Sequence, residues 1–269
     1  MPPASRTRQR RYDPTKTRTA VLAQFAHVRT AVEALTPAQL ALPTRLGDWT
    51  VRDLAAHLTM AVGTISANLD REAPAKADVA LLDWPFATAD RAAQISDDTR
   101  TLAASTGTDL SDLSALYAQT AAAVADRLPA APDDRIVATR VGPMVLADFL
   151  VTRCVELVVH TDDLNDATGL AVPYDRQALA ACTRLLADAL AAKAPGGATE
   201  VRIPPYAVVQ CIEGPRHTRG TPPNVVETDP LTWLRLATGR TDWSTALDAA
   251  KVSASGERAD LSALLPLLG

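Results

Sequence analysis

Apolar residues recur at helical spacing in four long segments of the N-terminal half of the chain. These segments cover residues 21–35, 54–69, 110–128 and 146–164. Positions three or four residues apart share one face of an α-helix, and an apolar face must be buried against another element. The pattern therefore predicts four amphipathic helices that pack together as a bundle.

Local signals indicate where the second helix begins and what separates it from the third. Thr50-Val51-Arg52-Asp53 has the form of a capping box, with Asp in place of the usual Glu. Residues 70–108 have a weaker pattern, with one short helical piece over residues 87–96. Since loops of this length are often functional, we expect a long connection between the two halves of the bundle that could cover a site.

The pattern changes after residue 166. An Ala- and Leu-rich helix is predicted over residues 175–193, and capped helices are predicted to begin at Asp229 and Asp260. Seven of the chain's 19 prolines fall between Pro195 and Pro230, as in the loops of a small sheet. Short segments rich in β-forming residues lie at 201–203, 207–212, 224–228 and 251–254.

The expected fold class is therefore α followed by α+β, in two domains. We expect residues 18–166 to form a four-helix bundle and residues 167–269 to form a small α+β domain. Residues 1–17 carry several basic and almost no apolar side chains, which is typical of a disordered tail.

Composition and charge narrow the class of protein. Hydrophobic residues make up 47% of the 269-residue chain and charged residues 22%, as in ordinary globular proteins. The formal net charge of −4 and the 4% of aromatic residues argue against nucleic acid as a partner. No stretch approaches the roughly 18–20 apolar residues of a membrane span, and the polar N-terminus does not resemble a secretory signal. Three widely spaced cysteines fit free thiols in a reducing compartment, so we expect a cytoplasmic protein.

Two of the chain's four histidines fall on helix faces that we expect to point inward. His57 lies on the second predicted helix, whereas Glu156 and His160 lie four residues apart on one face of the fourth. Two histidines and one carboxylate form a ligand set of catalytic zinc, which leaves a fourth position for water or substrate. These three residues are our candidate metal ligands. The alternatives are that Glu156 and His160 form an ion pair on the surface, and that His57 is a core histidine whose hydrogen bonds are satisfied by its neighbours.

Neighbouring residues on the fourth helix could support such a site. Arg153 lies on an apolar stripe, where an unpaired charge is costly, so it needs Glu156 or an anionic ligand as its partner. Asp163 follows His160 by three residues, and it either orients that histidine or belongs only to the last turn of the helix. Cys154 points to a different side, and we expect a buried apolar residue there rather than a nucleophile.

A basic loop in the second half offers a different kind of site. Residues 210–220 include Arg216, His217 and Arg219, with glycine and proline residues on both sides. Two guanidinium groups and an imidazole could clamp the carboxylate of a substrate. The alternative is a solvated loop whose cations pair with nearby glutamates.

Two stretches of the first half resemble one protein family. Residues 47–58 read Gly-Asp-Trp-Thr-Val-Arg-Asp-Leu-Ala-Ala-His-Leu, and residues 153–164 read Arg-Cys-Val-Glu-Leu-Val-Val-His-Thr-Asp-Asp-Leu. They are similar to the second and fourth helices of the mycothiol-dependent maleylpyruvate isomerase family, which belongs to the DinB-like metal-binding bundles. In this resemblance the family's metal triad falls on His57, Glu156 and His160, which their spacing had already selected.

The second half resembles sterol-carrier-protein-like domains. The resemblance rests on residues 229–240, Asp-Pro-Leu-Thr-Trp-Leu-Arg-Leu-Ala-Thr-Gly-Arg, and on residues 246–268. Such a domain follows the bundle in the isomerase family, where one of its arginines assists catalysis. The candidates for that catalytic role are Arg216 and Arg219, and the candidates for binding the cofactor are Arg153 and His217.

The resemblance implies a divalent-metal-dependent enzyme, most simply with zinc, that uses mycothiol or a similar low-molecular-weight thiol. Such an enzyme isomerises a small electrophilic, anionic substrate or transfers the thiol to it, so the expected partners are the thiol and the substrate. Residues 215–223 do not resemble the isomerase's own loop, which leaves the substrate open, and the oligomeric state is open too. Two alternatives remain, a non-catalytic lipid- or sterol-carrier-like binding protein and a structural metal-binding protein.

Overall fold

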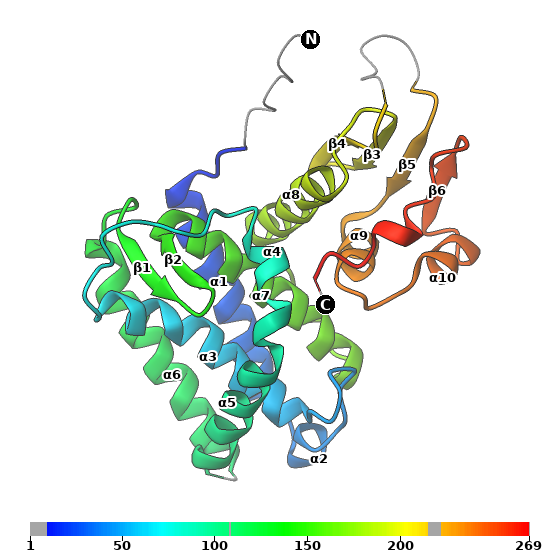
Figure 1. Cartoon of the computed structure of the whole chain (residues 1–269). Helices are drawn as coiled ribbons and strands as arrows, with labels where there is room; N and C mark the ends of the chain where they lie inside the picture. Colours follow the sequence, from blue (N-terminus) through cyan, green and yellow to red (C-terminus); the bar gives the residue numbers. More distant parts are fainter. Residues whose placement is uncertain (1–9, 108, 215–221, 269) are drawn as a thin grey trace.

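Helices make up most of the first half of the molecule, and a four-stranded sheet lies in the second half (Figure 1). The computed structural model describes residues 10–107, 109–214 and 222–268. The predicted fold class, a helical bundle followed by a small α+β domain, is confirmed. Within the described residues, no helix has both the length and the apolar character that crossing a membrane requires.

Four long helices build the bundle, as the apolar pattern predicts. α1 lies against α6 and α7, and α3 also lies against α6 and α7, so the four helices close around one core. Fully buried leucines such as Leu54, Leu113 and Leu157 fill that core, and each stabilises the fold by about 2 kcal/mol. The four helices are α1 Pro14–Glu33, α3 Val51–Leu69, α6 Leu110–Arg127 and α7 Leu146–Thr168.

The start of α3 follows from the predicted capping box. The Thr50 side chain accepts a hydrogen bond from the backbone N–H of Asp53, and the Asp53 side chain accepts one from the backbone N–H of Thr50 at 2.8 Å. A short helix, α2 Pro37–Leu40, precedes this cap. Because the cap fixes where α3 begins, it also fixes which face of α3 His57 occupies two turns later.

The disordered tail predicted over residues 1–17 extends too far along the chain, because the first helix begins before residue 18. α1 begins at Pro14, because the Asp13 side chain caps the helix and proline is well suited to the first helical position. Arg10 is also held, since its side chain pairs with Asp188 at 2.9 Å. The tail prediction is therefore wrong for residues 14–17, and residues 1–9 lie outside the described part of the chain.

The connection between α3 and α6 holds more helix than expected. α4 Trp84–Ala87 and a 3₁₀ turn η1, Ala89–Arg91, lead into α5, Ala92–Ser105, which packs along α3. The predicted piece over residues 87–96 is therefore wrong in extent, because few apolar residues on α5 reveal its helical period. α5 matters for the site because it brings the buried Thr99 against α3.

A two-stranded hairpin that the pattern does not predict leads into α7. β1 Ile136–Thr139 pairs antiparallel with β2 Gly142–Val145, and α7 begins at the next residue. After α6, a 3₁₀ turn η2, Leu128–Ala130, precedes the hairpin. The strands are only four residues long, so their alternation is too brief to stand out in the sequence.

The second half consists of a long helix, a four-stranded sheet and two short helices. The strand order is β4-β3-β5-β6, with β3 and β5 parallel and the two outer pairs antiparallel. The elements are α8 Arg176–Lys193, β3 Thr199–Ile203, β4 Ala207–Cys211, β5 Val225–Thr228, α9 Pro230–Ala237, α10 Trp243–Asp248 and β6 Val252–Ser255. The helix expected from Asp260 is wrong: only a 3₁₀ turn, η3 Ser262–Leu264, forms there, since Pro266 follows closely.

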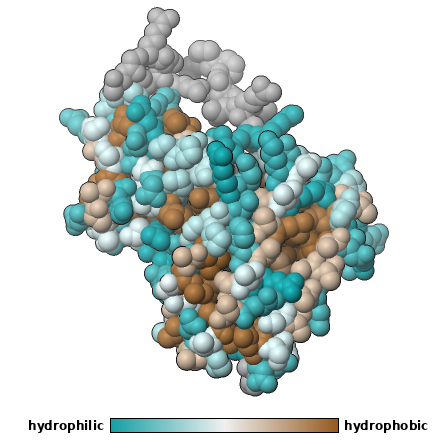
Figure 2. Space-filling view, turned by 180° about the vertical axis from the view of Figure 1, so that it is seen from behind, coloured by the Kyte–Doolittle hydropathy of each residue, from teal (hydrophilic) through white to brown (hydrophobic). Residues whose placement is uncertain are grey.

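α8 joins the two halves of the molecule (Figure 1). It lies against α1 and α7 of the bundle and against β4 and α9 of the sheet domain. On the face drawn in Figure 2, apolar areas alternate with hydrophilic ones. Among the described residues, a few large hydrophobic side chains are exposed at scattered positions: Leu22, Leu42, Phe86, Val208 and Leu247.

Candidate functional site

The three candidate metal ligands converge between two neighbouring helices. His57 comes from α3, and Glu156 and His160 come from α7. One ligand atom from each lies within 4.8 Å of the others. The Nε2 atoms of His57 and His160 lie 3.4 Å and 3.5 Å from the same carboxylate oxygen of Glu156. Two imidazole nitrogens and one carboxylate oxygen therefore point toward a common position, although His57 and Glu156 lie 99 residues apart in sequence.

Contacts behind each imidazole hold the ring in place. The Nδ1 atom of His57 lies 3.2 Å from the hydroxyl oxygen of Thr99 on α5. The Nδ1 atom of His160 lies 2.8 Å from a carboxylate oxygen of Asp163. The Trp49 ring also lies against His57, with centroids 5.1 Å apart. Each ring is thus anchored through Nδ1 and directs Nε2 toward Glu156, as ligand histidines commonly do.

Arg153 finds the partner that its position in an apolar stripe requires. Its guanidinium lies 3.7 Å from the second carboxylate oxygen of Glu156 and over the Phe149 ring, 4.7 Å from the centroid. It also donates to the backbone oxygen of Ala61 at 3.3 Å and to the Thr152 hydroxyl at 3.1 Å. The buried charge is thus paired with Glu156, and its part in binding a cofactor stays a prediction.

The buried groups of the site influence one another's ionisation. Burial would raise the pKa of Glu156, but hydrogen bonds from His160 and His57 and the charge of Arg153 lower it well below the ordinary value. Burial lowers the pKa of His57. Burial also works against a charged His160, but Asp163 and Glu156 raise its pKa. The carboxylate is therefore ionised, as a metal ligand must be, and a metal ion would compete with protons for the imidazole nitrogens.

A cavity of about 360 Å³ opens beside the triad. His57, Glu156 and Arg153 form one part of its wall. Apolar and polar side chains from α3, α4, α5, β1 and α7 form the rest, among them Met60, Thr64, Asn68, Trp84, Ile95 and Phe149. The donor atoms consequently face space large enough for a small ligand.

Three further arginines line this cavity at exposed positions. Arg140 pairs with Asp98, which also lines the cavity. For the guanidinium groups of Arg71 and Arg91, the described residues provide no acidic partner. The cavity thus combines the His57 imidazole and the Glu156 carboxylate with the positive charge of arginines at exposed positions, an arrangement that favours an anionic ligand.

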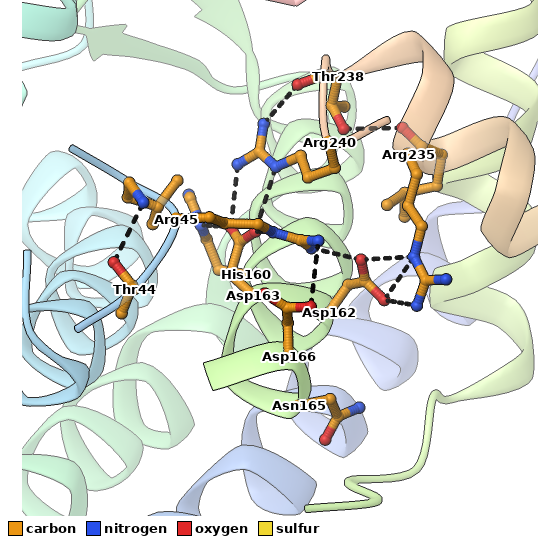
Figure 3. A network of polar contacts seen from close by, with 12 residues as sticks. Thr44, Arg45, His160, Asp162, Asp163, Asn165, Asp166, Arg235, Thr238 and Arg240 are labelled. Carbon is orange, nitrogen blue, oxygen red and sulfur yellow. Dashed lines mark hydrogen bonds and ion pairs between the residues drawn. The ribbon is translucent and has the colours of Figure 1, made fainter. Parts of the chain in front are cut away.

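Around Asp163, which the sequence analysis named as a possible orienting residue, the structure adds residues that it missed, and the predicted residues of the basic loop have no described position. Arg216, His217 and Arg219 lie outside the described residues. Behind His160, the buried Asp162 and Asp163 contact arginines from distant segments (Figure 3). Those arginines are Arg45, Arg235 and Arg240. The sequence did contain a signal for these arginines: two adjacent aspartates lie on an otherwise apolar helix, and buried carboxylates need cationic partners.

Comparison with known proteins gives the same two-part organisation. The family described as mycothiol maleylpyruvate isomerase N-terminal domain matches residues 21–165, which is more than half of the chain. The family described as bacterial SCP ortholog matches residues 175–267. Comparison with curated proteins gives no match.

Two solved structures share the fold over almost the whole length. They are crystal structures of the mycothiol-dependent maleylpyruvate isomerase and of a histidine-to-alanine mutant of that enzyme. Each is 16% identical to this chain, with a TM-score of 0.58, and the likeness covers 96% of this chain and 97% of the other. With the triad in its bundle and the matched C-terminal domain after it, the chain belongs to the mycothiol maleylpyruvate isomerase family and carries a bacterial SCP-type C-terminal domain.

Proposed function

We propose that this protein is a divalent-metal-dependent enzyme that uses a low-molecular-weight thiol such as mycothiol to isomerise a small anionic electrophile, or to transfer the thiol to it. The observation that carries the proposal is the convergence of His57, Glu156 and His160 beside a cavity of about 360 Å³ that His57 and Glu156 line. Membership of the isomerase family supports the same conclusion. Its three buried free cysteines suit the reducing conditions of the cytoplasm, where we expect it to act.

The spacing of the donor atoms fits a metal ion better than it fits direct hydrogen bonds. Donors held about 2.0–2.1 Å from a tetrahedral zinc ion lie about 3.3 Å from one another. The two His–Glu separations are 3.4 Å and 3.5 Å, whereas a charge-assisted hydrogen bond is shorter, about 2.7–2.9 Å. A zinc ion bound by these residues would lower the pKa of a coordinated thiol, so that thiolate is available near neutral pH.

The open side of the triad supports a catalytic rather than a structural role. A structural zinc site is closed by four protein ligands, whereas a catalytic site keeps one position for substrate. Here His57 and Glu156 also line the cavity, so that a ligand in it can reach the triad. The residues that line this cavity all belong to the bundle half of the chain, which argues against a carrier role located in the second domain.

The chain's own thiols are poorly suited to be the nucleophile. Cys154, Cys182 and Cys211 are all buried. Burial raises the pKa of Cys154 to about 12 and that of Cys211 to about 11, and it raises the pKa of Cys182 as well. At neutral pH these groups are protonated and inert. The reaction therefore needs a thiol from outside the chain, which the cavity can admit.

The cavity's side chains suit a reaction that passes through an enolate. Attack of a thiolate on an electron-poor carbon–carbon double bond forms a C–S bond and moves the π electrons onto the conjugated carbonyl oxygen. Rotation about the resulting single bond, followed by collapse of the enolate, expels the thiolate and leaves the other geometric isomer. Arg153 at the base and Arg71 and Arg91 near the mouth supply positive charge for the carboxylate and the developing enolate. If the adduct is protonated and kept instead, the product is a thioether and the enzyme is a transferase.

His160→Ala is expected to remove most of the metal affinity while the bundle stays helical. Because the substitution deletes one of three protein donors, we expect the affinity to fall by more than about a hundredfold. Metal content after dialysis and circular dichroism check the two parts of the prediction. His27→Ala is the matched control, since His27 contacts Pro173 instead of the triad. Unchanged metal binding by His160→Ala would contradict the assignment.

The cysteines are expected to be unreactive in the native protein. With a pKa of about 11 for Cys211, thiolate makes up about one part in a thousand at pH 8, and its fraction rises only as the pH approaches that pKa. A chromogenic disulfide reagent should therefore titrate almost no thiol in the folded protein at pH 8 and all three in guanidinium chloride. Rapid reaction of one native thiol would argue that the chain supplies its own nucleophile.

Turnover of maleylpyruvate by the zinc-loaded protein is expected to require an added thiol. The assay compares mycothiol, glutathione and no thiol, and follows the cis-to-trans change by absorbance and the thioether by mass spectrometry. Glu156→Gln should lower the rate at least about a hundredfold, because it removes the charged donor from the site. Isomer without thioether supports an isomerase, and thioether supports a transferase. If neither forms with zinc bound and thiol present, the proposed activity toward this class of substrate is wrong.

Removing positive charge at the mouth of the cavity is expected to weaken substrate binding more than turnover. Arg71→Gln and Arg91→Gln should each raise KM for an anionic substrate about fivefold and leave kcat nearly unchanged, since exposed charge contacts contribute modestly. Lys76→Gln removes the same charge from an exposed residue that pairs with Asp78 and does not line the cavity. An equal rise in KM for all three variants would show an effect of net charge alone.

A further inference from the structure

Two adjacent aspartates on α7 connect the bundle to the sheet domain (Figure 3). Asp162 and Asp163 are both 0% exposed, so each must receive compensating charge from its surroundings. Arg45, in the segment before α3, contacts both carboxylates. Arg235 and Arg240 arrive from the sheet domain, and each contacts a different aspartate. The domains are therefore joined by two parallel arginine–aspartate bridges.

Only the Arg240 bridge leads directly to a residue of the triad. One carboxylate oxygen of Asp163 lies 2.8 Å from His160 Nδ1 and accepts a hydrogen bond from Arg240 Nη2 at 2.9 Å. The other oxygen accepts from Arg240 Nε at 3.2 Å and from Arg45 Nε at 2.6 Å. Arg240 therefore holds both oxygens of Asp163 with its planar fork, which fixes the plane of that carboxylate.

The end of α9 fixes Arg240 in turn. The backbone N–H of Arg240 donates to the oxygen of Arg235 at 2.7 Å, and that of Gly239 donates to Leu236 at 3.4 Å. This is the hydrogen-bond pattern of a Schellman motif, and it requires the positive φ of 70° that glycine supplies at position 239. The Arg240 Nη1 atom also donates to the oxygen of Thr238 at 2.7 Å. The guanidinium is thus held by its own turn as well as by Asp163.

The neighbouring bridge offers a natural comparison. Arg235 donates to both oxygens of Asp162, at distances of 2.7–3.2 Å. Asp162 otherwise contacts Arg45 and the hydroxyl of Tyr174, and no contact joins it to the triad within the described residues. The two bridges thus cross the same interface from the same turn of α7, but only one of them touches the group that orients His160.

We propose that Arg240 is a positioning residue of the metal site. By holding both oxygens of Asp163, it fixes the acceptor for His160 Nδ1 and so directs Nε2 toward the point shared with His57 and Glu156. Docking of the sheet domain thereby raises the affinity of the bundle's triad for a divalent cation. This inference rests on the metal-binding role proposed above for the triad, and it adds that the second domain sets the strength of that binding.

The test compares zinc affinity across matched variants of the full-length chain. Zinc is titrated into metal-free protein in competition with a chromophoric chelator, for the wild type, Arg240→Met and Arg235→Met, and melting temperatures are measured alongside. Both substitutions remove one interdomain bridge, so both should lower the melting temperature. Arg240→Met should also weaken zinc binding about tenfold or more, whereas Arg235→Met should stay within about twofold of the wild type. Arg240→Lys, which keeps the charge but loses the fork, should fall between.

The outcomes separate this inference from the proposed function. If the wild type binds no zinc, the metal site and the inference fall together. If the wild type binds zinc and Arg240→Met binds it equally well, the inference alone is overturned. An equal loss in Arg235→Met and Arg240→Met would also overturn it, because general loosening of the interface would then explain both. Should Arg240→Met fail to fold, the ratio of zinc affinities between Arg240→Lys and Arg235→Met decides the matter in the same way.

Discussion

Three carboxylates on one buried helix impose the main constraint on this protein. Glu156, Asp162 and Asp163 all lie on α7, and the last two are completely enclosed. A buried carboxylate is tolerated only where cations and hydrogen-bond donors replace the water it loses. Burial would raise the pKa of Asp162 and Asp163, but their arginine partners, and His160 in the case of Asp163, lower it instead. The elements packed around α7 must therefore deliver these partners in precise places.

That requirement explains why segments distant in sequence meet at α7. α3 brings His57 to Glu156, the segment before α3 brings Arg45 to the aspartates, and the end of α9 brings Arg240. α5 contributes the Thr99 hydroxyl, which lies behind the His57 ring, and the side chains of Ile95 and Asp98, which line the cavity. The bundle and the second domain thus both supply the hydrogen-bond donors and cations that stabilise the carboxylates of α7.

The sequence predicted the parts of the site that follow a local rule. Glu156 and His160 are four residues apart on a strongly apolar helix, so their shared face was readable, and the capping box at Thr50 placed His57 on α3. For Arg153, whose charge lies in an apolar stripe, the sequence predicted either Glu156 or an anionic ligand as the partner, and the structure shows the pairing with Glu156.

Other parts depend on long-range packing and left no periodic signal. The period of α5 is hidden by its polar residues, so Thr99 did not appear as a neighbour of His57. Asp163 could be named as an orienting residue, but nothing in the spacing indicated that Arg240, 77 residues later, would hold it. The basic residues of the loop around His217 were predicted as an anion site from composition alone, and they lie outside the described residues.

The charge balance around α7 bears on which ligand the site accepts. Four guanidinium groups, those of Arg45, Arg153, Arg235 and Arg240, face the carboxylates of Glu156, Asp162 and Asp163. Asp166, whose side chain is 54% exposed, also approaches Arg45 at 3.8 Å, so that four cations face four carboxylates. A divalent cation on the proposed metal site would therefore leave the array with an excess of positive charge. An anionic fourth ligand reduces that electrostatic cost more than a neutral one does. At the proposed metal site, these charges would thus favour a thiolate or a carboxylate as the fourth ligand, independently of the exposed arginines that line the cavity.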